Sequence, residues 1–238
     1  MVELEPLVLY RDDAILVIDK PPGLLVHPNP HERGAPTCLG LLRGLVGEGL
    51  RTVHRIDRGT SGLVLFAVTQ ESASRLGAQF RERGVGKEYL ALVRGHLLGP
   101  RTIDQPVPRD IGGEPVPSIT SVRPLARAVV PEPVGRYDEG WFSLVALDLM
   151  TGRMHQARKH LHHIDHPVIG DKKHGDPVQN RFFQRRFGTR ELFLRAYRLR
   201  FVHPVTGAVV EACAGLSESW LRVAKGLGLA IPADLARE

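Results

Sequence analysis

The feature that most restricts the fold is the passage from a charged, glycine-punctuated segment, His54–Gly62, into the apolar run Leu63–Val68. A short run of Leu, Val and Phe after such a segment is typical of a buried strand. The strand places Asp57 at the rim of a core, where its carboxylate is partly removed from water and stays near Arg55 and Arg58. The alternative is a capped turn in which Asp57 only pairs with arginine, and spacing alone leaves both interpretations open.

Length and composition limit the class of protein. The 238 residues are 42% hydrophobic and 24% charged, which is typical of a globular chain. The longest wholly apolar run, Leu63–Val68, is far shorter than the roughly 20 residues that cross a bilayer. Residues 1–6 carry acids where a signal peptide carries bases, and Cys38 and Cys213 are too few for a disulfide framework. We therefore expect a cytoplasmic protein.

The charge of the chain is basic and uneven. The net charge is +6, and 26 Arg stand against 6 Lys. Arginine suits phosphate because its planar group donates two parallel hydrogen bonds. Between Thr151 and Arg186 there are eight Lys and Arg but three Asp. This pattern indicates either a solvated basic face or a surface that binds a polyanion such as RNA, and charge alone does not decide.

Hydrophobic patterns predict an α+β fold. We expect strands at Leu7–Tyr10, Ala14–Asp19, Gly62–Val68, Tyr89–Val93, Trp141–Leu149, Leu192–Val202 and Ala208–Cys213. We expect helices at Pro36–Leu45, Gln70–Arg83, His155–Ile164 and Ser217–Leu227, with Thr37 and Ser217 as caps. The Pro- and Gly-rich segment Pro100–Pro117 is interpreted as an irregular surface excursion. Many sequential strands with few helices favour a single domain over residues 1–238, with a large mixed, mainly antiparallel sheet flanked by helices.

Two further segments carry residues suited to catalysis. Tyr89 follows the flexible Gly84-Val-Gly86 segment and opens a strand, so its ring can stack on a nucleobase. A half-buried strand tyrosine is the alternative. On a helix that begins near His155, Arg158 and Leu161 share one face, and packing there lets the arginine reach a carboxylate.

The histidines of the third segment permit a metal hypothesis. His155, His162 and His166 include spacings that occur in zinc sites. No cysteine lies near them, however, and the His-Glu-x-x-His pattern is absent. We therefore expect no metal, and interpret the histidines as phosphate ligands or helix caps.

In their order, these segments resemble the three motifs of the RluA-type pseudouridine synthase family. The segment His54–Ala67 is similar to the HRLDxxTSGLLLFA motif of the family, Lys87-Glu-Tyr89 to its K-x-Y motif, and Thr151–Arg158 to its third motif. The opening segment Ile15–His27 is also similar to the first strand and loop of the family. Ile56 and Ala157 depart from the usual Leu and Ile, which leaves every charged group in place.

The resemblance implies an isomerase that converts uridine to pseudouridine in RNA. It implies Asp57 as the catalytic carboxylate, Tyr89 as a base-stacking residue and Arg158 as the partner that keeps Asp57 ionised. Arg55 resembles the residue that enters the RNA helix in place of the flipped base. No cofactor is implied, and a monomer without a separate RNA-binding domain is expected. The candidate RNA contacts are His54, Arg55, Arg58, Lys87, Arg153, His155, Lys172 and Lys173.

A narrower resemblance concerns the substrate. Gly170–Arg181, Phe187-Gly188 and His203–Gly207 look like the branch of the family that acts on the uridine at position 65 of tRNA. Two alternatives stay open: a relative that acts on ribosomal RNA, and, from a different class, a non-catalytic RNA-binding protein.

Overall fold

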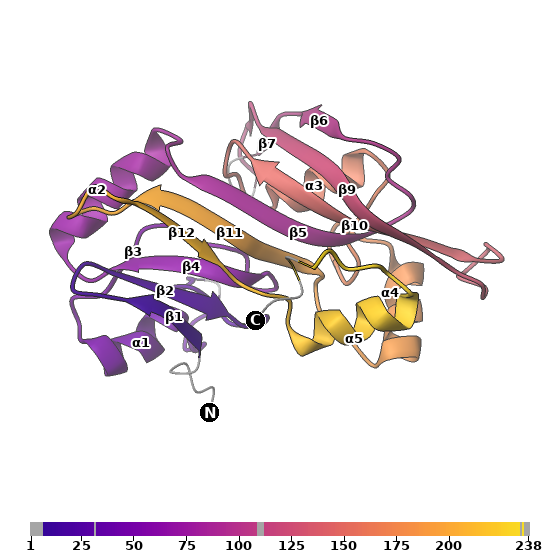
Figure 1. Cartoon of the computed structure of the whole chain (residues 1–238), viewed down its shortest axis with the longest axis horizontal. Coiled ribbons are helices and arrows are strands. Elements are labelled where there is room, and N and C mark those ends of the chain that lie inside the picture. The colour runs from indigo at the N-terminus through magenta and orange to yellow at the C-terminus, as the bar shows by residue number, and fades with distance from the viewer. Residues whose placement is uncertain (1–6, 31, 109–111, 234, 236–238) are drawn as a thin grey trace. The chain divides into compact units, whose positions relative to one another are not determined.

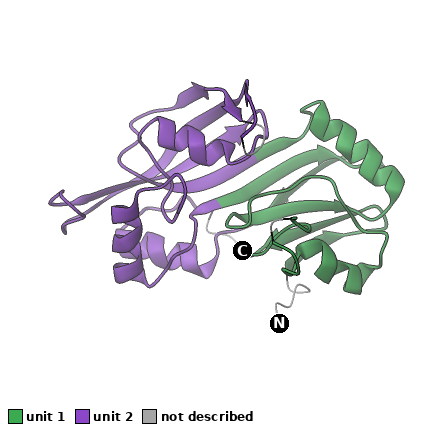
Figure 2. Cartoon of the chain, turned by 180° about the vertical axis from the view of Figure 1, so that it is seen from behind, with its two compact units in different colours: residues 1–87, 195–214 green, residues 88–194, 215–238 purple. Residues whose placement is uncertain are grey.

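The computed structural model describes residues 7–30, 32–108, 112–233 and 235. It has an α+β fold with a large mixed, mainly antiparallel sheet and helices, as predicted (Figure 1). The chain divides into two compact units, one of residues 1–87 and 195–214 and one of residues 88–194 and 215–238 (Figure 2). Residues 1–6, on which the signal-peptide argument depended, lie outside the described residues. In the described part of the chain, no helix is long and apolar enough to cross a membrane.

In the first unit the strand order is β1-β2-β4-β11, with β3 paired to β4 and β12 paired to β11. Its helices are α1 (Cys38–Val46) and α2 (Gln70–Arg81). Its strands are β1 (Val8–Arg11), β2 (Ile15–Lys20), β3 (Arg51–Thr52), β4 (Ser61–Ala67), β11 (Leu194–Val202) and β12 (Val209–Cys213). The pairs are antiparallel except for β4 with β11, which run parallel.

Local chemistry explains the elements around β4. Thr37 and Thr69 cap α1 and α2, because each side-chain oxygen accepts a hydrogen bond from the backbone N–H three residues on. Every residue of β4 is buried, as its apolar sequence predicts. Gly62 in this strand has φ +101°, and a Cβ there would lie 2.2 Å from the carbonyl oxygen of Ala196 on β11. Only glycine therefore fits where β4 and β11 meet.

In the second unit the strand order is β5-β10-β9-β6, with all neighbours antiparallel. Strands β7 and β8 form a separate two-stranded pair. The strands are β5 (Gly86–Arg94), β6 (Arg101–Asp104), β7 (Val107–Pro108), β8 (Pro115–Val116), β9 (Ile119–Val130) and β10 (Gly140–Leu149). The helices are α3 (Gln156–His163), α4 (Pro177–Phe187) and α5 (Glu218–Leu227).

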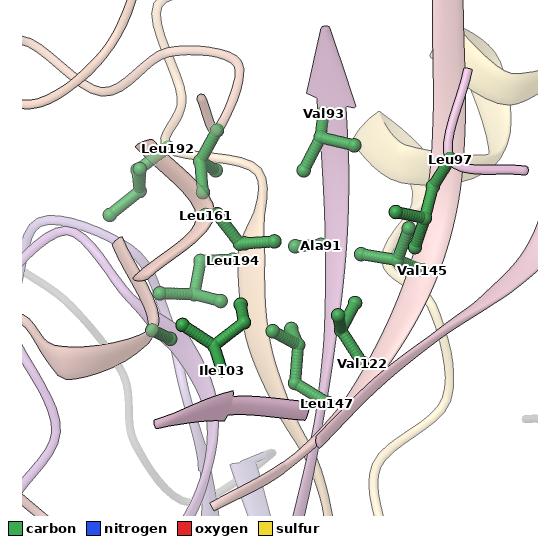
Figure 3. Packing of buried hydrophobic residues seen from close by; sticks show 12 residues of the cluster. Ala91, Val93, Leu97, Ile103, Val122, Val145, Leu147, Leu161, Leu192 and Leu194 are labelled. Atoms are coloured by element: carbon green, nitrogen blue, oxygen red, sulfur yellow. The ribbon is translucent and has the colours of Figure 1, made fainter. Parts of the chain in front are cut away.

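A cluster of buried aliphatic side chains fixes α3 within the second unit (Figure 3). Ala157 and Leu161 project from α3 into this cluster, and Tyr89 of β5 packs against it. Leu161 is fully buried, a state that contributes about 1.5–3 kcal/mol for a side chain of this size. The remaining members are Ala91, Val93, Leu97, Ile103, Val122, Val145, Leu147, Val168, Leu192 and Leu194.

The structure confirms the predicted strands and helices within a few residues at each end, but the interpretation of Pro100–Pro117 as irregular is wrong. That segment contains β6, β7 and β8, and β9 follows it directly. The pattern of β9 was hidden because Pro124 interrupts it, at a point where the register against β10 shifts. Ser217 is at the N-cap position of α5, but its side chain makes no capping hydrogen bond.

Candidate active site

The loop that carries Asp57 precedes β4, and its backbone is held tightly. The N–H of Thr60 donates to the carbonyl of Asp57 (3.1 Å), which closes a turn around the residues between them. The carbonyl of Arg58 accepts from the N–H of Gly23 (2.8 Å) and from Nζ of Lys20 (3.1 Å). Asp57 is half-buried, as predicted for the rim of the core. Hydrogen bonds therefore hold the backbone of the Asp57 loop both just before β4 and against residues 20–24.

Lys20 is the main anchor of that loop and was not among the predicted site residues. It is fully buried at the end of β2, and Nζ also donates to the carbonyls of Pro21 and Leu24, both at 2.9 Å. Burial lowers the pKa of Lys20 to about 8, while the acidic groups of Cys38 and Asp57 partly oppose the shift. The three hydrogen bonds of its ammonium group hold the turn after β2 against the Asp57 loop.

The two arginines beside Asp57 differ in their contacts. Nε of Arg58 donates to the carbonyl of Gly23 (2.8 Å), and its Nη1 pairs with Glu32. Arg58 thus ties the Asp57 loop to the 23–32 segment. Arg55 is exposed, which suits the predicted insertion into RNA.

His54 lies at the start of the same loop. Its ring stacks on Phe80 of α2 (4.7 Å between centroids), and its Nε2 accepts the N–H of Leu65 (2.9 Å). Burial, and secondarily the charge of Lys87, lowers the pKa of His54 to about 3. These contacts make His54 a neutral brace between the loop and β4. Its predicted contact with RNA, and that of Lys87, stay predictions.

In the second unit, Arg158 lies on α3 and is almost completely buried. Its Nε donates to Oδ2 of Asp171 (2.6 Å) and its Nη2 to Oδ1 (2.8 Å), a bidentate pair. The prediction that a packed arginine on this helix reaches a carboxylate is thus met by Asp171, which was not predicted. Pairing of Arg158 with Asp57 stays a prediction, since these residues belong to different units.

The side chain of Gln156 hydrogen-bonds to other polar groups of the third motif and to β9. Its Oε1 accepts from Oγ1 of Thr151 (2.7 Å) and from the N–H of Arg153 (3.1 Å). Its Nε2 donates to β9, to the carbonyl of Ile119 and to Oγ1 of Thr120, both at 3.0 Å. The amide therefore fixes the turn before α3 against the sheet, and so sets where the helix begins.

The remaining predicted RNA contacts of this unit surround the start of α3. Lys172 and Lys173 are exposed, while Arg153 and His155 are half-buried. Nδ1 of His155 lies 3.0 Å from Nε2 of His174. The structure thus gathers these basic groups around the start of α3 and the loop after residue 170.

The zinc hypothesis finds no support in these contacts. His155 is engaged with His174, and Nδ1 of His166 lies 2.9 Å from the carbonyl of Arg94. Within the described residues, no group of three or more His, Cys, Asp or Glu side chains is arranged to hold a metal ion.

The comparison with protein families identifies the class. Residues 14–163 match the sequence model described as RNA pseudouridylate synthase. This match spans more than half of the chain, so the protein belongs to that family. The family resemblance predicted from the motifs is confirmed.

Individual relatives narrow the comparison. The tRNA pseudouridine synthase C of Salmonella typhi is 38% identical over 93% of this chain and 89% of its own. The enzyme of the same name from Haemophilus influenzae is 37% identical over 93% of this chain and 97% of its own.

The fold has solved counterparts. Human RNA pseudouridylate synthase domain containing 1 superposes with a TM-score of 0.71 and 25% identity, covering 93% of this chain and 94% of that one. Human RNA pseudouridylate synthase domain containing 4 gives a TM-score of 0.74 at 24% identity, covering 96% and 95%, and supports the fold alone.

Proposed function

We propose that the protein isomerises uridine to pseudouridine in tRNA, and that its target is the uridine at position 65. The observation that carries the proposal is the half-buried Asp57, presented by a loop whose backbone is anchored by Lys20 and Gly23. A carboxylate that acts at a sugar–base junction has to be held in a fixed position, and the hydrogen bonds of this loop hold its backbone there. Family membership and the names of the relatives support the reaction and the class of RNA.

The reaction rearranges bonds within one nucleotide. The bond between N1 of uracil and C1′ of ribose breaks, the uracil turns, and C5 bonds to C1′. The hydrogen on C5 then leaves as a proton and N1 gains one, so atoms and electrons balance without a cofactor. The leaving base is also the incoming nucleophile, and the protein has to hold both fragments.

Each catalytic residue has a distinct role in the proposal. Asp57 acts at the sugar–base junction, and Arg158 keeps it ionised, because an opposite charge within about 4–6 Å favours the carboxylate. Tyr89 stacks on the target base, a contact worth about 1–3 kcal/mol. Arg55 fills the place that the flipped base leaves in the RNA.

The basic residues around these groups bind the RNA backbone. Exposed Lys172 and Lys173, together with Arg58, Lys87, Arg153 and His155, are the proposed contacts. Affinity for tRNA should therefore fall as salt rises, because phosphate contacts release counterions. We further propose a cytoplasmic monomer in which residues 1–238 form one catalytic domain.

The test uses tRNA transcribed with tritium at C5 of uracil. Pseudouridine formation releases that label to water, and primer extension maps the modified nucleotide. Wild-type protein should release tritium at position 65, while Asp57→Ala should release none and still bind tRNA. Asp13→Ala removes an exposed carboxylate of the same unit, in the turn between β1 and β2, and serves as the matched control.

Other outcomes separate the alternatives. Release from ribosomal RNA but not from tRNA would keep the chemistry and discard the substrate. Full function in Asp57→Asn, or no release from either RNA by wild-type protein, would leave the non-catalytic RNA-binding protein as the better explanation.

A further inference from the structure

Asp171 and Arg158 form a buried, bidentate ion pair. The exposed fractions of the two side chains are 0% for Asp171 and 10% for Arg158, and both carboxylate oxygens accept from the guanidinium. An arginine side chain is flexible, and a bidentate carboxylate restricts it to one orientation. The pair uses two of the five N–H groups of Arg158.

The carboxylate of Asp171 is itself fixed by its own loop. Oδ1 accepts the N–H groups of Lys173 (2.8 Å) and His174 (3.0 Å). Asn180 of α4 donates to the carbonyl of Asp171 (2.9 Å). Burial alone would raise the pKa of Asp171, but the hydrogen bonds from Arg158 and the loop outweigh it and lower that pKa. The carboxylate therefore stays charged and does not rotate.

Glycines close the same loop. A Cβ at Gly170 would lie 1.7 Å from the carbonyl oxygen of Glu191, and one at Gly175 would lie 2.1 Å from that of Asp171. The loop can take no side chain at either position without moving. A loop that only connects two elements usually tolerates changes of sequence. This loop does not, as expected if it holds another group in place.

We propose that Asp171 is a positioning residue of the reaction, which fixes the plane and direction of the Arg158 guanidinium. This inference rests on the proposed catalytic role of Arg158. Asp171 touches no reacting atom in this scheme and acts only through the arginine. A carboxylate with a merely structural role would change stability and leave the turnover number alone.

The same loop offers a matched control. Asp176 also pairs with an arginine, Arg94 (2.7 Å), and caps α4. This second pair is more exposed, at 33% for Arg94 and 19% for Asp176, and Arg94 has no proposed role in the reaction. Asp171→Asn and Asp176→Asn therefore remove the same charge from the same loop, but only the first affects Arg158.

The experiment measures kcat and KM for tritium release from tRNA. Asp171→Asn should lower kcat about 100-fold, as expected for misplacement of a catalytic group by about 1 Å, with KM within about twofold. Asp176→Asn should keep kcat within about twofold of wild type. In an Arg158→Lys background, Asp171→Asn should cause no further loss, because lysine cannot form the bidentate pair.

Circular dichroism establishes that each variant is folded. If Asp171→Asn unfolds, Asp171→Glu carries the test, since it keeps the charge and displaces the carboxylate by one methylene; a tenfold lower kcat supports the proposal. Wild-type kcat in a folded Asp171 variant would overturn it, as would equal losses in both Arg158 backgrounds. Absence of release by wild-type protein would instead refute the proposed function, and this inference with it.

Discussion

His54 should make the protein acid-labile by an amount that its contacts define. Its Nε2 accepts the N–H of Leu65, so the ring has to lose that hydrogen bond when it is protonated. Burial holds the pKa of His54 at about 3 in the folded protein. An unfolded histidine has a pKa of about 6.5, so below that pH the unfolded chain binds the additional proton. The contribution of neutral His54 to the free energy of unfolding is therefore present in full above about pH 6.5. It is lost progressively as the pH falls towards 3.

The magnitude at pH 5 follows directly. This pH lies about 1.5 units below the unfolded pKa, and each unit corresponds to about 1.36 kcal/mol. Because of His54, the free energy of unfolding should therefore be about 2 kcal/mol lower at pH 5 than at neutral pH. The folded pKa hardly affects this figure, because at pH 5 the folded protein holds almost no proton on His54. His54→Gln removes the titration, while the amide oxygen of glutamine can still accept the N–H of Leu65.

Urea unfolding followed by circular dichroism at pH 7.5 and pH 5 measures the effect. Wild type should be more stable than His54→Gln at pH 7.5, since the variant loses the stack on Phe80. That advantage should shrink by about 2 kcal/mol at pH 5. His163→Gln, at an exposed position of α3, is the matched control and should show no such change. A difference between wild type and His54→Gln that does not vary with pH would refute the reasoning.

Two further substitutions test the supports of the Asp57 loop. Gly62→Ala places a Cβ 2.2 Å from the carbonyl oxygen of Ala196, at a left-handed φ. The free energy of unfolding should therefore fall by at least about 2 kcal/mol in a urea titration. If the variant were as stable as wild type, β4 and β11 would be able to separate without cost. Lys20→Met leaves the carbonyls of Pro21 and Leu24 without their ammonium donor, and should cost about 2–4 kcal/mol in the same assay. A loss below about 1 kcal/mol for Lys20→Met would mean that other donors replace the ammonium.

Local patterns made much of the fold predictable. The Asp57 loop and β4 are adjacent in sequence, so the switch from charged residues to an apolar run was sufficient. Helix α1 was predicted from Thr37 and the spacing of the apolar residues after it, which are also adjacent in sequence. Strand β9 was missed because Pro124 breaks its alternation. Helix α4 was not predicted, although Asp176 followed by Pro177 is a helix-start signal.

The supporting residues of the candidate site were harder to predict. A lysine after an apolar strand normally indicates a surface charge, yet Lys20 is buried because three backbone carbonyls converge on it. Asp171 follows Arg158 by thirteen positions, and the bend between them depends on how the 164–170 segment folds back along the cluster that contains Val168. Neither environment leaves a periodic trace in the sequence. Both are set by tertiary geometry.

The parallel pairing of β4 with β11 has a consequence for synthesis of the protein. Residues 88–194, most of the second unit, leave the ribosome after β4 and before nearly all of β11. The 126 residues between β4 and β11 take about 6–25 s to synthesise at about 5–20 residues per second, and during that time β4 has one edge unpaired. An unpaired apolar strand is a template for aggregation, so this interval is one in which a nascent-chain chaperone would help. The unit that carries Asp57 is thus begun early in translation and completed only near its end.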